Sequence, residues 1–347
     1  MKLSLNRKQL TKHFPQAFTL IEVLVVVSII ALLIAILLPA FKRVRSRSYE
    51  TKCAANLSQF GKGFYAYATE FKGYLCSGSF DPEMASSENQ KDRDRDGPVD
   101  RVGWIADLVN RKCGRPAEAL CPSNLAQVNQ KLGRGTHGWM GTRFRNGDDY
   151  RTWDLIDQRI KRGYNSNYTQ AWYMARSQAN GKGFNLKRPA NTMGPLRDSF
   201  MLRVNPSVIP LMGDGRIDTS TNYEGNLGYS QLTVKTLTDG PYVGLYGPQN
   251  YADFGPAHGI SKSWYIDESG SSVEIAPHDR ANILFADGHV SQFIDKVRNG
   301  AFNLALIENP DPSQPPRYVQ EDIDGSVFDG VLSLGRRKAD PEGIVLK

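Results

Sequence analysis

The feature that most constrains this chain is an apolar run near its N-terminus, residues 18 to 38, in which Glu22 is the only charged residue. An α-helix rises about 1.5 Å per residue, so a run of this length can cross a hydrocarbon core of about 30 Å. The apolar region of a secretory signal peptide is shorter, about 7 to 15 residues. The remaining sequence is rich in polar residues, and 23% of the chain is charged. The run therefore predicts one transmembrane helix attached to a water-soluble body.

The formal net charge of +7 is concentrated on the two flanks of this run. The first 17 residues carry four basic and no acidic residues, which leaves +3 for the rest of the chain. Four more basic residues follow the run: Lys42, Arg43, Arg45 and Arg47. Lipid phosphates are the nearest partners of such flanking charges, so we expect no nucleic-acid binding. Because the two flanks carry equal numbers of Lys and Arg, the positive-inside rule does not set the orientation.

Glu22 is the residue that a simple membrane anchor does not explain. A charge inside the hydrocarbon core costs about 2.5 to 3.5 kcal/mol on insertion scales, so a buried carboxylate normally has a partner. The run contains no basic residue, and we expect Glu22 to lack a partner in its own helix. Its partner would then come from another molecule. The alternative is that Glu22 lies near the interface and its side chain reaches the water.

The stretch "AFTLIE", residues 17 to 22, followed by the long apolar helix, resembles the type IV prepilin signature. Pilins and the pseudopilins of type II secretion share this signature. The resemblance implies a cytoplasmic leader at 1–17, cleavage between Ala17 and Phe18 by a membrane prepilin peptidase, and N-methylation of Phe18. It also implies that Glu22, at the fifth mature position, pairs with the N-terminal amine of a neighbouring subunit. Ala17 replaces the usual glycine, which implies slower processing.

Pro39 follows the apolar run at the twenty-second mature position, where many members of this family carry a helix-kinking proline. Proline inside a helix removes one hydrogen bond and clashes with the preceding turn, at a cost of about 3 kcal/mol. The resemblance implies that Pro39 lies within a continuous helix and contributes to assembly. The alternative is that Pro39 ends the span.

Residues 39 to 72 show the periodicity of an amphipathic helix. Apolar residues recur at steps of mostly three and four, so one face should pack on a globular head. With residues 18–38 as the transmembrane part, the helix would measure near 80 Å. Gly61 and Gly63 indicate either fraying or close packing, and Gly73 is a suitable stop. The apolar stripe consists of Phe41, Val44, Tyr49, Cys53, Leu57, Phe60, Phe64, Ala68 and Phe71.

Residues 73 to 347 predict an extracytoplasmic α+β head. Gly, Pro, Asn and Asp separate short apolar runs, which indicates short strands joined by long loops. Strands are expected at 208–213, 242–247 and 281–293, and Asp287-Gly288 marks a hairpin inside the last of these. The fold class is therefore α+β and pilin-like, with a long N-terminal helix packed on a mostly antiparallel head.

The same hairpin resembles the H-x9-DG box found near the C-terminus of many bacterial prepilin-like proteins. Here His278 precedes Asp287-Gly288-His289 by eight residues, one fewer than the usual nine. His278, Asp287 and His289 could meet across the hairpin and bind a metal. The alternative is that the Asp287 side chain closes the turn and the histidines cap loops.

A second candidate metal site lies in "DRDRDGPVD", residues 92 to 100. Asp92, Asp94, Asp96 and Asp100 match the first, third, fifth and ninth positions of a calcium loop, with Gly97 at the sixth. The twelfth position, Gly103, lacks the usual bidentate glutamate. The stretch either binds Ca²⁺ or is a solvated charge run neutralised by its own arginines.

The four cysteines all follow the apolar run, at positions 53, 76, 113 and 121. Their spacing contains no C-x-x-C pair, which argues against a zinc site. If the head is exported, disulfides are permitted and three complete connectivities are available. The alternative is that the thiols are unpaired and buried as small apolar groups.

No enzyme signature is present. "GRGTHG", residues 133 to 138, fits G-x-G-x-x-G but lacks the flanking strand and helix, so we expect a loop there. The favoured function is a structural, non-enzymatic subunit anchored in the inner membrane and assembled with like or related subunits by a secretion or pilus assembly platform. Its filament would lie in the periplasm or at the surface. The alternative is a membrane-tethered monomer whose large head binds or processes a surface polymer.

Overall fold

The structure is a computed structural model of the full chain. It describes residues 19–79, 97–135, 138–139, 152–182, 189–202, 204–241, 249–259, 263–266, 272–276, 278–296, 300–302, 304–307, 317–320 and 327–328, with single residues at 186, 298 and 332. Its described part divides into two compact units, which meet in the sequence between Arg45 and Ser46. The leader 1–17 and Phe18 lie outside the described residues.

Helix α1 spans Leu20–Glu70 and contributes to both units. In the first unit, residues 20 to 38 are apolar on every face apart from Glu22 and Ser28, and none of the described residues of this unit is buried. Pro39 lies inside the helix, which continues beyond it. Phe41 and Val44 are each 66% exposed, so the predicted apolar stripe is wrong at its first two positions.

In the second unit α1 forms the centre of the head, and here the predicted stripe is confirmed. Cys53 is the first fully buried residue of the helix. Phe60 and Phe64 make edge-to-face contacts with Trp104 of α2 (Trp104–Asn110), with ring centroids 5.5 and 6.0 Å apart. The buried face comprises Cys53, Asn56, Leu57, Phe60, Gly61, Gly63, Phe64 and Ala68.

Close packing explains the two glycines of this helix. A Cβ atom at Gly61 would lie 3.2 Å from Leu284 Cδ1, and one at Gly63 would lie 2.8 Å from the backbone oxygen of Cys113. The head therefore approaches α1 closely from two sides. The helix ends at Glu70, and in the turn after it Gly73, at φ +82°, donates its N–H to the Ala68 oxygen at 3.0 Å.

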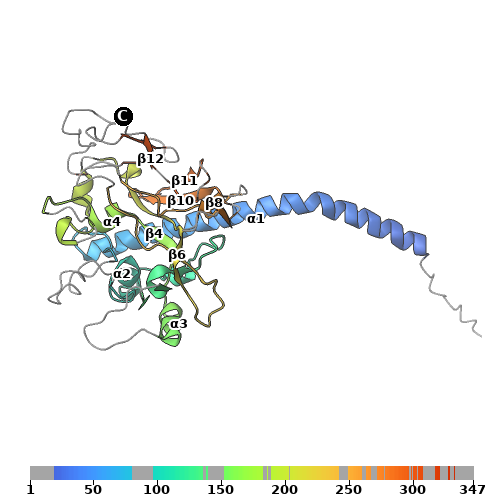
Figure 1. The fold of residues 1–347 in the computed structure, drawn as a ribbon, viewed down its shortest axis with the longest axis horizontal. Coiled ribbons are helices and arrows are strands. Elements are labelled where there is room, and N and C mark those ends of the chain that lie inside the picture. The colour runs from blue at the N-terminus through green and yellow to red at the C-terminus, as the bar shows by residue number, and fades with distance from the viewer. Residues whose placement is uncertain are drawn as a thin grey trace, which may run out of the picture. The chain divides into compact units, whose positions relative to one another are not determined.

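A four-stranded antiparallel sheet covers α1 in the order β11-β10-β5-β4 (Figure 1). Its strands are β4 (Tyr168–Gln170), β5 (Pro210–Asp214), β10 (Arg280–Phe285) and β11 (Val290–Ile294). Strand side chains alternate between faces, and β10 uses both. Leu284 packs at Gly61 of α1, whereas Ile283 and Phe285 join a second apolar cluster. The predicted strand at 208–213 and the hairpin within 281–293 are confirmed.

The other strands form smaller or more irregular sheets. A five-stranded sheet has the order β1-β7-β6-β2-β3, in which β1 and β7 are parallel. In it, Arg134–Gly135 and Gly138–Trp139 pair as a short hairpin, so the expectation of a simple loop at 133–138 is wrong. The strands are β1 (Val128–Asn129), β2 (Arg134–Gly135), β3 (Gly138–Trp139), β6 (Ile217–Asn222), β7 (Leu232–Val234), β8 (Ser263–Ile266), β9 (Ser272–Ala276), β12 (Leu304–Ile307) and β13 (Arg317–Gln320).

Two further α-helices, α3 (Trp153–Lys161) and α4 (Trp172–Arg176), complete the described regular structure together with short 3₁₀ turns. A long apolar N-terminal helix followed by a head of mixed sheets confirms the predicted α+β, pilin-like fold class. The strand expected at 242–247 lies outside the described residues.

Candidate functional site

The N-terminus of α1 carries a capping box made by Thr19 and Glu22. Glu22 Oε2 accepts hydrogen bonds from the Thr19 backbone N–H and from Thr19 Oγ1, each at 2.8 Å. In return, Glu22 N–H donates to Thr19 Oγ1 at 3.2 Å. This reciprocal arrangement satisfies two backbone N–H groups that the first turn of a helix leaves without intrahelical acceptors. The expectation that Glu22 lacks a partner in its own helix is therefore wrong.

The sequence held a local signal for this cap. Thr19-Leu20-Ile21-Glu22 fits the T-x-x-E pattern of a capping box directly before an apolar run. The apolar residues after it are exposed, and Ser28, the one hydroxyl among residues 20 to 38, bonds back to the Val25 oxygen at 2.7 Å. The N-terminal segment thus combines a satisfied polar end with an apolar surface that is long enough to cross a membrane.

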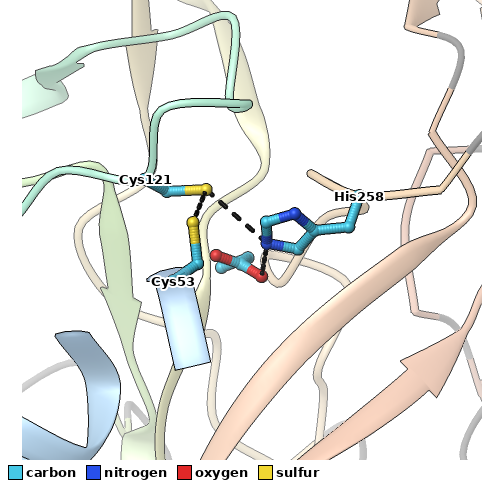
Figure 2. Close-up of side chains that lie close together, drawn as sticks. Cys53, Cys121 and His258 are labelled. Atoms are coloured by element: carbon cyan, nitrogen blue, oxygen red, sulfur yellow. Dashed lines mark hydrogen bonds and ion pairs between the residues drawn. The ribbon is translucent and has the colours of Figure 1, made fainter. Parts of the chain in front are cut away.

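A second candidate site lies inside the head, where two cysteines, an aspartate and a histidine converge (Figure 2). Cys53 comes from α1, Cys121 from the segment after the 3₁₀ turn Pro116–Glu118, Asp214 from the end of β5, and His258 from the segment before β8. All four side chains are buried, and their candidate ligand atoms lie within 4.8 Å of one another.

Two short contacts organise this cluster. Cys53 Sγ lies 2.6 Å from Cys121 Sγ, and His258 Nε2 lies 3.1 Å from Asp214 Oδ2. The two pairs meet where His258 Nε2 approaches Cys121 Sγ at 3.6 Å. Burial alone lowers the pKa of His258, but the charge and hydrogen bond of Asp214, with a smaller contribution from Cys121, raise it to about 10. His258 is therefore a cation at neutral pH, paired with Asp214.

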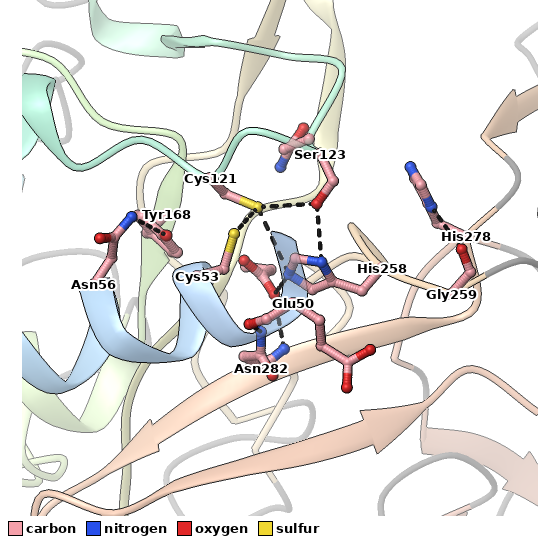
Figure 3. A network of polar contacts seen from close by, with 12 residues as sticks. Glu50, Cys53, Asn56, Cys121, Ser123, Tyr168, His258, Gly259, His278 and Asn282 are labelled. Carbon is pink, nitrogen blue, oxygen red and sulfur yellow. Dashed lines mark hydrogen bonds and ion pairs between the residues drawn. The ribbon is translucent and has the colours of Figure 1, made fainter. Parts of the chain in front are cut away.

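Backbone and side-chain groups around the cluster hold it in place (Figure 3). Ser123 Oγ lies 2.8 Å from His258 Nδ1, and Asp214 Oδ2 accepts the Asn282 N–H at 2.7 Å. The Asn282 amide also donates to the Glu50 oxygen of α1 at 3.2 Å. Asn282 thus connects β10, the Asp214 carboxylate and the helix one turn before Cys53.

The cluster offers the donor types of a zinc site, with two sulfurs, an imidazole nitrogen and a carboxylate oxygen. Asp214 Oδ1 has no hydrogen-bond partner among the described residues. Two sulfurs bound to one zinc at about 2.3 Å in a tetrahedron would, however, lie about 3.8 Å apart. The observed sulfur separation of 2.6 Å is too short for that arrangement.

The structure brings two of the H-x9-DG-like residues together and places the third elsewhere. Asp287 Oδ1 accepts the His289 N–H at 3.1 Å and lies 2.5 Å from His289 Nδ1, while Gly288 has φ +89°. His278 precedes β10, and Asp287 follows that strand, whose six residues span about 20 Å. His278 Nδ1 instead lies 3.4 Å from the Gly259 oxygen.

Of the four candidate calcium ligands, Asp92, Asp94 and Asp96 lie outside the described residues. Asp100 Oδ2 forms an ion pair with Arg159 Nε at 2.8 Å, and the Asp100 backbone oxygen accepts from the Asn110 amide. Calcium binding at this loop stays a prediction.

Sequence reasoning missed Asp214, His258 and Asn282. They are separated from Cys53 by more than 150 residues, and no local spacing connects them. The one available signal was the pair of cysteines, of which Cys53 lies on the predicted buried stripe of α1.

Comparison with known proteins identifies the N-terminal segment. The family model of the prokaryotic N-terminal methylation motif matches residues 15–38. No curated protein and no solved structure matches the chain. The match covers the apolar run, Glu22 and the expected cleavage position. The chain therefore carries a prepilin-type N-terminal signal, and this signal and the apolar helix indicate anchoring in a membrane by a single span.

Proposed function

We propose that this protein is a pilin-like or pseudopilin-like structural subunit of a type II secretion or type IV pilus-like system. The observation that carries the proposal is the methylation motif at residues 15–38, which coincides with an exposed apolar helix of spanning length. In this proposal residues 1–17 are a cytoplasmic leader, 18–38 cross the inner membrane, 39–72 form the stalk helix and 73–347 form the extracytoplasmic head. No catalytic step in the head is required.

The proposed maturation has three steps. A prepilin peptidase cleaves between Ala17 and Phe18, the new Phe18 amine is methylated, and the assembly platform moves the subunit into a filament. There Glu22 meets the amine of a neighbouring subunit. The Thr19 hydrogen bonds both use Glu22 Oε2, so the amine would approach Oε1. Pro39 would allow the helix to bend as lipid contacts are replaced by protein contacts.

Mass spectrometry of the mature N-terminus tests the first two steps. We expect a chain that begins with N-methylated Phe18, and an intact Met1 would overturn the proposed processing.

An assembly assay then separates the two functions of the Glu22 side chain. Glu22→Gln keeps a carbonyl acceptor for the cap but removes the charge that an amine would recognise.

We expect Glu22→Gln to abolish crosslinked subunit ladders in native membranes while insertion and cleavage continue. Thr19→Ala is the matched control, because it removes the hydroxyl bonds of the cap at a cost of about 1 kcal/mol but leaves the charge in place. Thr19→Ala should still assemble. Assembly of Glu22→Gln at the wild-type level would reject the pairing and favour a tethered, monomeric ectodomain.

A further inference from the structure

We propose that Cys53 and Cys121 form a disulfide bond in the exported protein, and that this bond fastens α1 to the head at the point where the helix becomes buried. The inference rests on the proposed function in one respect, the extracytoplasmic location of the head, because disulfides persist in oxidising compartments.

The geometry of the two sulfur atoms is the first support. Both cysteines have no exposed surface, and their Sγ atoms are 2.6 Å apart. A disulfide requires about 2.0 Å, whereas two sulfurs on one zinc ion lie about 3.8 Å apart. The observed separation is nearer to a bonded pair, and a small movement closes it.

The segments that carry the two cysteines are held together independently of the sulfurs. The Asn56 amide, one turn after Cys53, donates to the backbone oxygens of Ala119 and Leu120 at 3.0 and 3.3 Å. On the other side, the Cys121 N–H donates to Asn167 Oδ1 at 2.8 Å. These bonds fix the helix and the loop in register, so the sulfurs face each other without further ordering.

The bond would form by thiol–disulfide exchange with a disulfide of an exported oxidoreductase or of an oxidised small thiol. One cysteine thiolate attacks that disulfide and releases one thiol, and the second cysteine then displaces the other. Overall, two thiols lose two protons and two electrons, and the incoming disulfide is reduced to two thiols. Because the pair has no exposed surface in the folded head, exchange takes place before the head closes.

The groups around Cys121 keep its sulfur in the thiol form once the head has closed. His258 Nε2 lies 3.6 Å from Cys121 Sγ, and Asp214 Oδ2 holds the imidazole from the same side at 3.1 Å. Burial, the contact with Cys53 and the charge of Asp214 raise the pKa of Cys121 well above its usual value, and only the His258 hydrogen bond lowers it. The thiolate that exchange requires is therefore formed more readily before the head closes around Cys121.

The position of the bond gives it a function in a helix-anchored protein. Cys53 is the first buried residue of α1, and the bond closes a 68-residue separation. With the bond, a pull on the helix would reach the head through a covalent link at the first buried residue of α1. Without the bond, the pull would be carried by the non-covalent contacts along the buried part of α1 and by the backbone beyond Glu70.

Peptide mapping of the full chain, purified from membranes in detergent, tests the bond directly. The protein is denatured with N-ethylmaleimide present and digested with trypsin and a glutamate-specific protease without reduction. Cleavage after Glu118 separates Cys113 from Cys121. We expect peptides 53–62 and 119–131 to be joined and unlabelled, and labelled separately after reduction. Separate labelled peptides without reduction would overturn the proposal.

Metal analysis of the same preparation adds a second outcome. About one zinc per chain, with both cysteines labelled after chelation and denaturation, would overturn the disulfide and assign a metal site instead. Because the mapping is independent of the N-terminus, an unprocessed Met1 with joined peptides would reject the proposed function alone. A methylated Phe18 with free thiols would reject the disulfide alone.

Thermal unfolding of cysteine variants, with and without a reductant, tests the disulfide a second time. We expect a reductant to lower the unfolding midpoint of the wild type by roughly 5 to 15 °C. The Cys53→Ala/Cys121→Ala protein should lose this response, and Cys113→Ala should keep it. An equal reductant response in the double variant would overturn the proposal.

Discussion

The two parts of helix α1 differ in what surrounds them, although both are regular helix. Residues 20 to 38 are exposed and, apart from Glu22 and Ser28, apolar on every face, and Glu22 at their start is already hydrogen-bonded to Thr19. Residues 53 to 68 are apolar on one face only, and that face is buried against α2 and β10. The apolar surface of the first part requires lipid or neighbouring chains to cover it. The apolar face of the second part is covered by the head of the same chain. Side-chain changes should therefore affect the stability of the head only in the second part.

The largest expected effect is the loss of a buried aromatic ring. Phe64 has no exposed surface and packs on Trp104, so Phe64→Ala should lower the free energy of unfolding of the head by about 3 to 5 kcal/mol. Leu33, 55% exposed, is the matched position in the first part, and Leu33→Ala should leave the unfolding midpoint unchanged. Thermal unfolding of the full chain in detergent measures both. Similar losses in the two variants would contradict the comparison.

The next effect is a dependence on pH that only the head should show. The folded state raises the pKa of His258 from 6.5 to about 10, against the effect of burial, through Asp214 and Cys121. A raised pKa stabilises the protonated folded state, so this contribution is complete below about pH 6.5 and is lost as the pH rises towards 10. The loss should be on the order of 4 kcal/mol between these limits.

The control for this pH dependence is His258→Gln, which removes the titrating group. Unfolding midpoints measured from pH 6 to pH 10 should fall in the wild type and change much less in the variant. An equally steep decline in both proteins would assign the pH dependence to other groups.

The smallest effect distinguishes two glycines that lie two residues apart on the buried part of α1. Gly63→Ala should cost about 1 to 2 kcal/mol, because its Cβ would lie 2.8 Å from a backbone oxygen that cannot rotate away. Gly61→Ala meets only the end of the Leu284 side chain at 3.2 Å, and alanine favours the helix. Its stability should stay within about 1 kcal/mol of the wild type. Thermal unfolding compares the two variants, and a larger loss of stability in Gly61→Ala than in Gly63→Ala would contradict the close packing at Gly63.

The sequence predicted those features that depend on neighbours along the chain. The spanning length of the apolar run, the buried stripe from Cys53 to Ala68 and the hairpin at Asp287-Gly288 all follow from local periodicity and turn chemistry. The capping box is equally local, because Glu22 is both the only charge in the apolar run and the N3 residue of the T-x-x-E pattern that begins at Thr19. Phe41 and Val44 continue the apolar spacing but are exposed, because periodicity does not indicate where the head begins.

The buried cluster depends on contacts between segments that are distant in sequence. Cys53 and Cys121 are 68 residues apart, and Cys121 and His258 are 137 residues apart. Nothing in the spacing of the cysteines selects this pair from the available connectivities. The choice follows from the packing of α1 against the loop after Glu118.

By itself, the sequence determined that this chain has an apolar helix of membrane-spanning length with a prepilin-type signal, because twenty or so apolar residues and a short motif act through local geometry. Only the tertiary structure decided which glycine is closely packed, which cysteines meet and which histidine is charged. Those properties depend on which groups share a low-dielectric interior. Close packing brings these groups together from segments that are far apart in the sequence, and the sequence separation does not indicate which segments come into contact.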